Sequence, residues 1–471
     1  MDRLNSSSGS NPKMGLLPLY LELYDKVVPE LRPRIEGFVK LINEQFVKRG
    51  MSVMLSPICR VGSEFRAAIE YFEKEDVDAI VTLHLAYSPS LESAQLLSKT
   101  RLPLIILDTT PFFELVSSQD TDAIMLNHGI HGVQDLCNVL LRFGKNFVVE
   151  VGHWGESDVL DRVSQDVRAA RIARFISKSK VGSIGGPFEG MGDFLVEHHM
   201  LKNKIGLDVI NSEVKDIVSF LPESNSSEVN YELEYLLKNY DCRNLEKDSL
   251  IKSVRAGIAV RNWIKRNRLN SFTMNFTKFN RSCGLPTIPF LETEICLAKG
   301  LGYAGEGDVI TSAFIGALNS VYSEVTFTEM FCPDWKENII FLSHMGEVNI
   351  DLFAQKAVLK EKDLPFLDID SPVIGVGKLK SGKAVLANLA PLKESFHLII
   401  SLGEMVDVED EKNFSESIRG WFRPQIPIID FLTAFSQAGG THHSALIYGG
   451  ESIAREIAIF GKMMGWDVTE L

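Results

Sequence analysis

The sequence predicts an α/β protein in which two Rossmann-like α/β domains with parallel sheets are followed by a β-rich, barrel-like C-terminal domain. Short apolar runs alternate with amphipathic helical patterns over roughly the first two-thirds of the chain, which is typical of βαβ units. From about residue 323 the pattern changes to closely spaced strand-like runs, which is typical of an antiparallel sheet or barrel. At roughly 150 residues per domain, 471 residues allow about three domains.

The N-terminal α/β domain is expected over residues 1–178. Apolar runs such as MSVMLS and VDAIVTLHL alternate there with helical patterns such as FRAAIEYFEKE. A strand is expected at 146–152, and the long amphipathic pattern VLDRVSQDVRAARIARFISKS ends the domain. Because ligands bind at the carboxyl ends of parallel strands, functional residues should cluster at those ends.

The central α/β domain is expected over residues 179–322, beginning with KVGSIGG and including SFTMNF and GLPTIPFLETEICLAKG. The C-terminal domain is expected over residues 323–471. Its first runs, VTFTEMF, NIIFLSHM, PVIGVGKL, AVLANLA and FHLIISLG, are separated by turn residues without intervening helical patterns. This spacing predicts antiparallel pairing.

Composition and charge exclude several classes of function. The formal net charge of −13 argues against a nucleic-acid partner, which requires clustered Lys and Arg. The leader MDRLNSSSGSNPK is polar, and no later run reaches the ~18 apolar residues of a membrane span, so no membrane partner is expected. The six cysteines are scattered without CxxC spacing, which favours a reducing, cytoplasmic location over a disulfide framework.

Two glutamates are candidates for chemistry. Glu306 lies in the glycine-rich turn of GYAGEGDVITSAFIGAL, directly before a helical pattern. The turn could instead be a helix cap or a phosphate loop, but it lacks the Walker Lys-Ser/Thr pair and the GxGxxG spacing. Glu329 shares one face of the strand VTFTEMF with apolar side chains, and its simpler interpretation is an edge-strand acid that faces water.

Two histidines complete a possible metal site. His344 ends the strand NIIFLSH, and His443 follows two glycines in AGGTHHS. Either one alone is better explained as an ordinary structural imidazole. Together with Glu306 and Glu329, however, they form a mixed oxygen and nitrogen set that suits Mn²⁺, Co²⁺ or Mg²⁺ with positions open for substrate oxygens.

A second group of polar residues lies in the N-terminal domain. His84 ends a predicted strand in LHLAYSPS, and Asn127, His128 and His131 lie in LNHGIHG. Strand ends of open α/β sheets bind ligands, which favours a substrate role. Decoration of a helix N-terminus is an equally good explanation of His128 and His131 from the residues alone.

These motifs resemble the L-arabinose isomerase family, within the L-arabinose and L-fucose isomerase group. The resemblance rests on SFTMNF, GYAGEGD, FTEMF, SHMGEV and AGGTHHS, which occur in this order. It implies that Glu306, Glu329, His344 and His443 bind a divalent metal, most often Mn²⁺, and that the two glutamates are the acid and base. At position 128 a His replaces the family's Gln, and the first strand also departs from the family pattern.

The resemblance further implies an aldose–ketose isomerase acting on a monosaccharide, converting L-arabinose to L-ribulose through a cis-enediol and also D-galactose to D-tagatose. It implies a homohexamer whose pocket is shared between subunits. Isomerisation of another aldose (L-fucose, D-arabinose or another pentose), a non-catalytic sugar-binding protein and a metal-dependent hydrolase are alternatives. The substrate-binding residues expected from the motifs are His84, Asn127, His128, His131, Met191, Phe276, Met345 and His442.

Overall fold

The computed structural model describes residues 11–116, 119, 122–409 and 414–471. The chain divides into two compact units, which we treat separately. The N-terminal unit comprises Ser10–Arg174 and Lys462–Gly465, and the C-terminal unit comprises Phe175–Gly461 and Trp466–Leu471. Among the helices of the described ranges, none combines the length and apolar character that a bilayer crossing requires.

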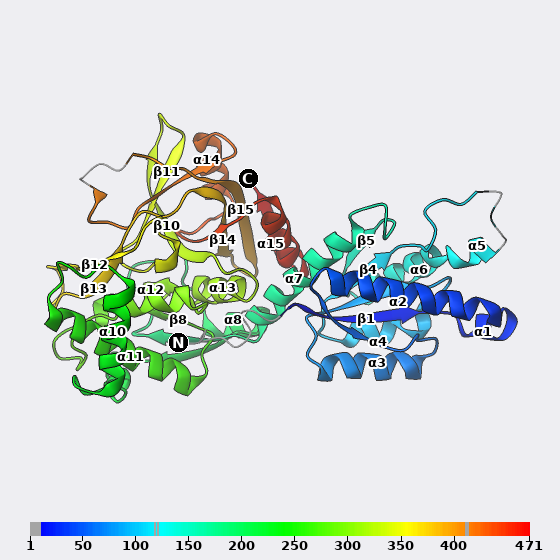
Figure 1. The fold of residues 1–471 in the computed structure, drawn as a ribbon, viewed down its shortest axis with the longest axis horizontal. Helices are drawn as coiled ribbons and strands as arrows, with labels where there is room; N and C mark the ends of the chain where they lie inside the picture. The colour runs from blue at the N-terminus through cyan, green and yellow to red at the C-terminus, as the bar shows by residue number, and fades with distance from the viewer. Residues whose placement is uncertain (1–10, 117–118, 120–121, 410–413) are drawn as a thin grey trace. The chain divides into compact units, whose positions relative to one another are not determined.

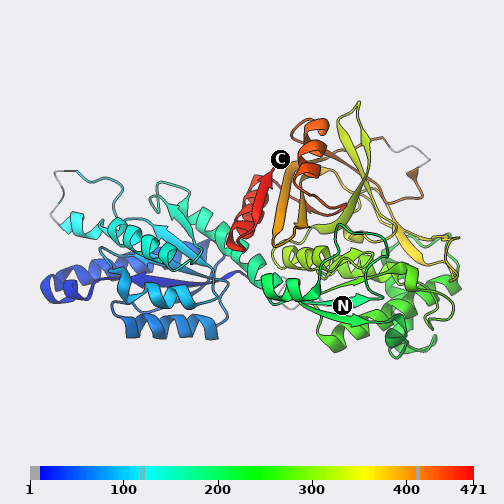
Figure 2. The same cartoon turned by 180° about the vertical axis from the view of Figure 1, so that it is seen from behind.

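The N-terminal unit is a doubly wound parallel sheet of five strands in the order β2-β1-β3-β4-β5. Helices α2 (Arg32–Lys48) and α3 (Gly62–Lys74) lie on opposite faces of this sheet (Figures 1 and 2). Gly15 of β1 allows α3 to approach closely, because a Cβ there would lie 2.7 Å from the Phe72 ring. The strands are β1 (Lys13–Leu19), β2 (Ser52–Leu55), β3 (Ala79–His84), β4 (Leu104–Asp108) and β5 (Val148–Val151).

Each face of this sheet has its own apolar core. Alternate residues of the strands point to opposite faces, so β1 contributes Leu16 to one core and Leu17 to the other. The remaining helices are α1 (Glu22–Val27), α4 (Ala94–Lys99), α5 (Asp122–Leu126), α6 (Gly129–Arg142) and α7 (Val159–Ser177), and the unit boundary falls after Arg174 within α7.

The C-terminal unit begins with a second parallel sheet, of four strands in the order β7-β6-β8-β9. Its strands are β6 (Lys180–Ile184), β7 (Asp208–Ser212), β8 (Ser271–Met274) and β9 (Gly302–Gly305). The helices of this region are α8 (His198–Lys204), α9 (Val214–Val218), α10 (Ser227–Asn239), α11 (Lys247–Asn267), α12 (Phe290–Ala298) and α13 (Val309–Asn319).

The rest of the C-terminal unit is a closed antiparallel barrel of six strands. The order β14-β17-β10-β11-β16-β15 closes because β15 also pairs with β14, and β18 (Asp467–Glu470) adds to β15. The barrel strands are β10 (Val325–Asp334), β11 (Ile339–Ser343), β14 (Gly382–Pro391), β15 (Phe396–Met405), β16 (Gly420–Pro424) and β17 (His443–Tyr448). A separate antiparallel pair is formed by β12 (Val358–Glu361) and β13 (Val373–Val376). The helices α14 (Ile428–Gln437) and α15 (Glu451–Met463) precede and follow β17 in the chain. The predicted fold class is confirmed.

Helix α13 joins the parallel sheet to the barrel. All eleven of its residues are buried, and it contacts β8 and β9 on one side and β10, β14 and β17 on the other. A helix that is apolar on all sides is expected only where it is enclosed by protein. Because α13 follows β9 directly, the turn before it lies where the two sheets meet.

A buried ionic network lies between α10, α11 and α12. The Arg261 guanidinium donates to both carboxylate oxygens of Glu232 and of Glu292 over 2.6–3.2 Å, and all three side chains are at most 3% exposed. The forked geometry satisfies both carboxylates at once, which is the condition under which buried charges are tolerated.

Candidate functional site

Glu306 lies in the tight turn between β9 and α13. It adopts a left-handed φ of 61°, which a non-glycine residue keeps only where its surroundings enforce it. The next residue, Gly307, has a φ of 87° and approaches the Gly186 carbonyl so closely that a Cβ would lie 2.3 Å from that oxygen. The Glu306 carbonyl accepts a hydrogen bond from the Phe188 N–H (2.8 Å). The turn thus fixes a carboxylate that is only 8% exposed.

Glu329 and His443 are brought together by strand register. In the antiparallel pair β10 and β17, Glu329 lies directly opposite His443, and His443 Nε2 is 3.1 Å from Glu329 Oε1. The same nitrogen is 3.4 Å from Glu306 Oε2. Three of the four predicted metal ligands therefore meet at one point, at the junction of β9, β10 and β17.

Asp308 orients the His443 ring from behind. Its Oδ2 lies 2.9 Å from His443 Nδ1, and its Oδ1 accepts the N–H of Thr311 (2.9 Å) as the N-cap of α13. Asp308 and His443 are both fully buried. A proton held on Nδ1 by the carboxylate leaves the Nε2 lone pair facing the two glutamates, which is the orientation of metal-binding histidines.

His344 follows β11, beside Glu329. Its Nε2 is 3.2 Å from Glu329 Oε1, and its Nδ1 is 2.6 Å from Glu347 Oε2. The hydroxyl of Tyr303, on β9, donates to the other oxygen of Glu347. His344, like His443, therefore has a carboxylate on the ring nitrogen that faces away from the glutamates.

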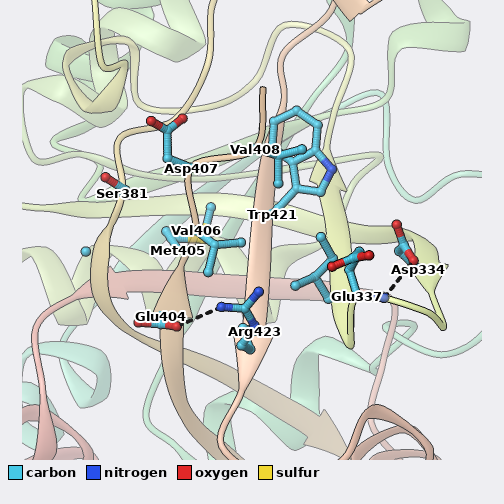
Figure 3. Close-up of a pocket in the computed structure, with 12 residues that line it drawn as sticks. Asp334, Glu337, Ser381, Glu404, Met405, Val406, Asp407, Val408, Trp421 and Arg423 are labelled. Atoms are coloured by element: carbon cyan, nitrogen blue, oxygen red, sulfur yellow. Dashed lines mark hydrogen bonds and ion pairs between the residues drawn. The ribbon is translucent and has the colours of Figure 1, made fainter. Parts of the chain in front are cut away.

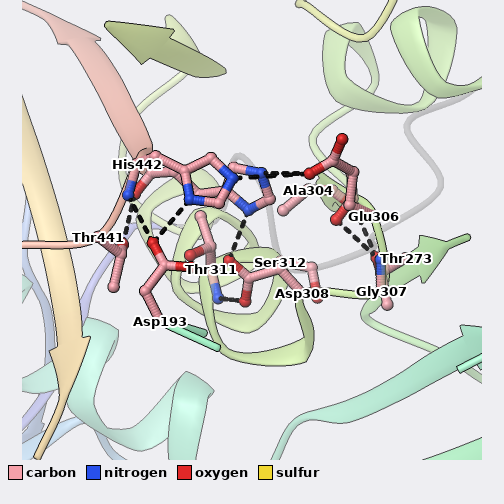
Figure 4. Close-up of polar contacts among 12 residues, drawn as sticks. Asp193, Thr273, Ala304, Glu306, Gly307, Asp308, Thr311, Ser312, Thr441 and His442 are labelled. Atoms are coloured by element: carbon pink, nitrogen blue, oxygen red, sulfur yellow. Dashed lines mark hydrogen bonds and ion pairs between the residues drawn. The ribbon is translucent and has the colours of Figure 1, made fainter. Parts of the chain in front are cut away.

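His442 approaches Glu306 from a more open side. Its Nε2 is 3.6 Å from Glu306 Oε2, and its Nδ1 is 2.6 Å from Asp193 Oδ2 (Figure 4). Phe194, the residue after Asp193, stacks on the His443 ring, with the ring centroids 4.9 Å apart and the ring planes inclined by 8°.

Four of these residues form a group that could hold a metal ion. Glu306, Glu329, His442 and His443 each offer one ligand atom, and these atoms all lie within 4.8 Å of one another. Glu306 Oε2 and His443 Nε2 are buried and lack a well-aligned hydrogen-bond partner among the described residues, as expected of atoms that serve a ligand. Carboxylate oxygens and imidazole nitrogens suit Mn²⁺, Co²⁺ or Mg²⁺.

The histidines and glutamates strongly perturb one another. Burial raises the pKa of Glu306, but His442 and His443 outweigh burial and lower the pKa to about 2. Burial opposes ionisation of Glu329 in the same way, yet His344 and His443 hold its pKa well below the usual range. Burial lowers the pKa of His344, but Glu347 and Glu329 outweigh it and raise the pKa to about 10. Such mutual perturbation is characteristic of functional sites.

The structure places His84, Asn127, His128 and His131 in the N-terminal unit. His84 is buried at the end of β3, 3.0 Å from Ser88 Oγ, and burial lowers its pKa to about 3, so the ring is neutral. The Asn127 amide is occupied by two hydrogen bonds to the backbone of Phe112. His128 Nε2 contacts His131 Nδ1 (2.6 Å) at the start of α6.

The other predicted substrate-binding residues lie in the C-terminal unit. Phe276 is 7% exposed after β8, and its ring lies 5.7 Å from that of Phe188. Met191 is partly buried in the loop that carries Phe188 and Asp193, and Met345 is partly buried next to His344. Their role in substrate binding stays a prediction.

Three carboxylates behind the histidines were missed by the sequence reasoning. Asp308 and Glu347 stand inside motifs that were recognised, GEGD and SHMGEV, so their nearness to predicted ligands was the available signal. Asp193 had no such signal, because its partner His442 is 249 residues away in the chain.

A separate cavity of about 720 Å³ lies against the barrel and is lined by other residues (Figure 3). Its polar groups largely satisfy one another: Arg423 pairs with Glu404 (3.1 Å), and Asp334 accepts the backbone N–H of Glu337 (3.0 Å). The cavity offers no converging set of unpaired donors or acceptors comparable to the cluster at Glu306 among the described residues.

A buried set of carboxylates and imidazoles at strand ends, each imidazole supported by a further carboxylate, is the arrangement expected of an enzyme active site. Comparison with known proteins identifies its class. Residues 197–324 match the model of the L-arabinose isomerase central domain, and residues 324–467 match that of the L-arabinose isomerase C-terminal domain.

Relatives align over nearly the whole chain. The L-arabinose isomerase of Shouchella clausii is 23% identical over 96% of this chain and 92% of its own length. That of Herpetosiphon aurantiacus is 22% identical over 89% of this chain and 85% of its own, and that of Thermotoga maritima is 24% identical over 83% and 81%. The chain belongs to the L-arabinose isomerase family of aldose–ketose isomerases.

Proposed function

We propose that this enzyme is a divalent-metal-dependent isomerase that converts L-arabinose to L-ribulose through a cis-enediol, with D-galactose to D-tagatose as a secondary reaction. One observation carries the proposal: two buried glutamates and a buried histidine converge, and Glu306 Oε2 and His443 Nε2 face the same space 3.4 Å apart. A sugar-binding protein without chemistry has no use for such a set of ionisable groups.

The metal ligands on this proposal are Glu306, Glu329, His344 and His443. His442 competes with His344 for the fourth position, since it belongs to the group within 4.8 Å. The His344 side chain is 5% exposed and that of His442 is 39% exposed. We therefore assign the enclosed His344 to the ion and the open His442 to the sugar. Mn²⁺ is the preferred ion by family resemblance.

Isomerisation moves one hydrogen between C1 and C2 and another between the two oxygens. Glu306 and Glu329 are both ionised at neutral pH, so each can accept a proton from the sugar and return it to the neighbouring atom. A divalent ion, when bound, supplies Lewis acidity that polarises the carbonyl and neutralises the enediolate charge. His442 accepts a hydrogen bond from a sugar hydroxyl at the open side of the cluster, and the apolar Phe276 limits the access of water to the sugar.

Family resemblance also leads us to propose a cytoplasmic homohexamer in which the sugar pocket is shared between subunits, with His128 and His131 reaching a neighbour's site. The six cysteines, all free thiols, support a reducing compartment. Light scattering of the purified protein would test the assembly, and a stable monomer with full activity would exclude a shared pocket.

A second candidate is an isomerase of the same mechanism with another aldose as its substrate. His128 contacts the predicted sugar-binding His131 directly (2.6 Å). The family pattern has Gln at this position, so His128 gives His131 a different hydrogen-bond partner. A different hydrogen-bonding pattern at a sugar pocket changes which hydroxyl configuration is accepted.

The experiment that tests both candidates is a ketose assay on a panel of aldopentoses and aldohexoses, including L-fucose and D-arabinose. Chelator-treated protein is assayed with and without added Mn²⁺. We expect Mn²⁺-dependent L-ribulose from L-arabinose. Product from another sugar alone would keep the mechanism and change the substrate, and no ketose from any sugar, with sugar binding intact, would favour a binding protein.

A further inference from the structure

Asp193 holds His442 at two points through one carboxylate oxygen. Asp193 Oδ2 accepts the His442 backbone N–H (2.9 Å) and lies 2.6 Å from its Nδ1 (Figure 4). Fixing both the backbone and the ring nitrogen of one residue leaves its imidazole with a single orientation. In the neutral ring this contact favours the proton on Nδ1, which leaves the lone pair of Nε2 pointing toward the space beside Glu306 Oε2.

The loop that carries Asp193 is itself fastened to the site. It connects β6 to α8, and the N–H of Phe188 at its start binds the Glu306 carbonyl. Phe194, directly after Asp193, is 3% exposed and stacked on the His443 ring. Asp193 is therefore held between two contacts with the active site, so its carboxylate is placed with respect to the cluster.

We propose that Asp193 is a positioning residue that acts through His442 on the binding of the sugar. The inference rests on the proposed function. His442 is 39% exposed, whereas the His344 and His443 side chains are 5% and 0% exposed. A histidine on the open side of the cluster meets the sugar rather than enclosing the ion, and an Nε2 acceptor matches a sugar hydroxyl, which is a hydrogen-bond donor.

Three variants test this inference. Asp193→Ala removes both contacts, whereas Asp193→Asn keeps an oxygen that can accept both, because one oxygen makes both in the native protein. Glu189→Ala is the matched control, since it removes an exposed carboxylate from the same loop. At saturating Mn²⁺ we expect Asp193→Ala to raise KM about tenfold with a smaller change in kcat, and the other two to stay within about threefold of wild type.

Three further measurements separate this role from a merely structural one. In a double-mutant cycle, Asp193→Ala should add nothing to the KM of His442→Ala, because Asp193 acts through that ring. The Kd of Mn²⁺, read from the electron paramagnetic resonance signal of the free ion, should not change in Asp193→Ala. The Kd of L-arabitol, a sugar analogue that cannot isomerise, should rise about tenfold by calorimetry.

An unchanged KM and L-arabitol affinity in Asp193→Ala, additive effects in the cycle, or a loss of Mn²⁺ affinity in place of sugar affinity would each overturn the inference. An Asn variant as impaired as the Ala variant would also overturn it, because the geometry would then not be what matters. Wild-type protein that binds L-arabitol but forms no ketose would reject the proposed isomerase and leave calorimetry to decide on Asp193. Wild-type protein that neither binds L-arabitol nor forms ketose from any sugar of the panel would reject both.

Discussion

Replacing Asp308 with Asn separates the two tasks that this buried side chain performs. Its Oδ1 accepts the N–H of Thr311 and caps α13, while its Oδ2 faces His443 Nδ1, both at 2.9 Å. An asparagine that keeps its carbonyl oxygen on the helix must turn its NH₂ group toward His443. Because that group only donates, Nδ1 has to accept, and the imidazole proton moves to Nε2, the atom that faces the glutamates.

We expect this substitution to weaken the binding of the metal and to leave the stability of the fold nearly unchanged. Asn is as good an N-cap as Asp, so the free energy of unfolding should change by less than about 1 kcal/mol. An Nε2 that carries a proton cannot bind a cation. Because the ring is fully buried, water cannot replace the asparagine as the hydrogen-bond partner of Nδ1. Loss of a partner behind a metal ligand weakens metal binding by about 10–100-fold, or about 1.4–2.7 kcal/mol.

The assay is a Mn²⁺ titration of chelator-treated Asp308→Asn, with thermal unfolding measured in parallel. Ser226→Ala is the control, since Ser226 caps α10 by accepting the Val229 N–H (3.3 Å). It should lose about 1 kcal/mol of stability and bind Mn²⁺ normally. The reasoning would be refuted if Asp308→Asn bound Mn²⁺ as tightly as wild type, or if it lost stability while keeping its Mn²⁺ affinity.

Three further predictions concern the site and its surroundings. Glu306→Gln and Glu329→Gln should each abolish ketose formation with circular dichroism unchanged, because an amide cannot take up a proton from the sugar; wild-type turnover in either would reject the acid–base assignment. Arg261→Met removes the guanidinium that two buried carboxylates share, and should lower the free energy of unfolding by about 3–5 kcal/mol in urea titrations; a loss below 1 kcal/mol would contradict the role given to the network. The pKa of His344 is raised to about 10 by its ion pairs with Glu347 and Glu329. These ion pairs therefore stabilise the metal-free, chelator-treated protein fully below pH 6.5, and their contribution is lost as the pH rises toward 10. Binding of Mn²⁺ requires histidine ligands to be deprotonated and neutral, so the increase in Tm on adding Mn²⁺ should be larger at pH 9 than at pH 6, and an equal increase would count against His344 as a ligand.

Local patterns in the sequence were sufficient to predict the fold class. Strands of the parallel sheets are short apolar runs between helices, and β3 ends at His84, where the pattern LHLAYSPS places its end. Elements of this kind are decided by residues a few positions apart. Closure of the barrel was predicted only as a possibility, because it depends on β17 pairing with β10 and β14 and on β11 pairing with β16, strands far apart in the chain whose pairing no local pattern encodes.

The candidate site divides in the same way. The turn at Glu306 and the strand at Glu329 are local features, and the family motifs that contain them were sufficient to predict both glutamates as site residues. The ring orientations are not local, because Asp308 and His443 are 135 residues apart and Asp193 and His442 are 249 apart. Which of His344 and His442 completes the metal set depends on burial, a property of the packed chain and not of a motif.

The placement of α13 explains why the site requires both parts of the C-terminal unit. The N-cap residue of this helix, Asp308, belongs to the turn that carries Glu306, and it also holds His443 at the start of β17. The parallel sheet therefore supplies one glutamate and the orientation of a histidine that the barrel supplies. Any change that shifts α13 along its axis must move Glu306 and the His443 ring together, so the chemistry at the cluster depends on the packing of this buried helix between the two sheets.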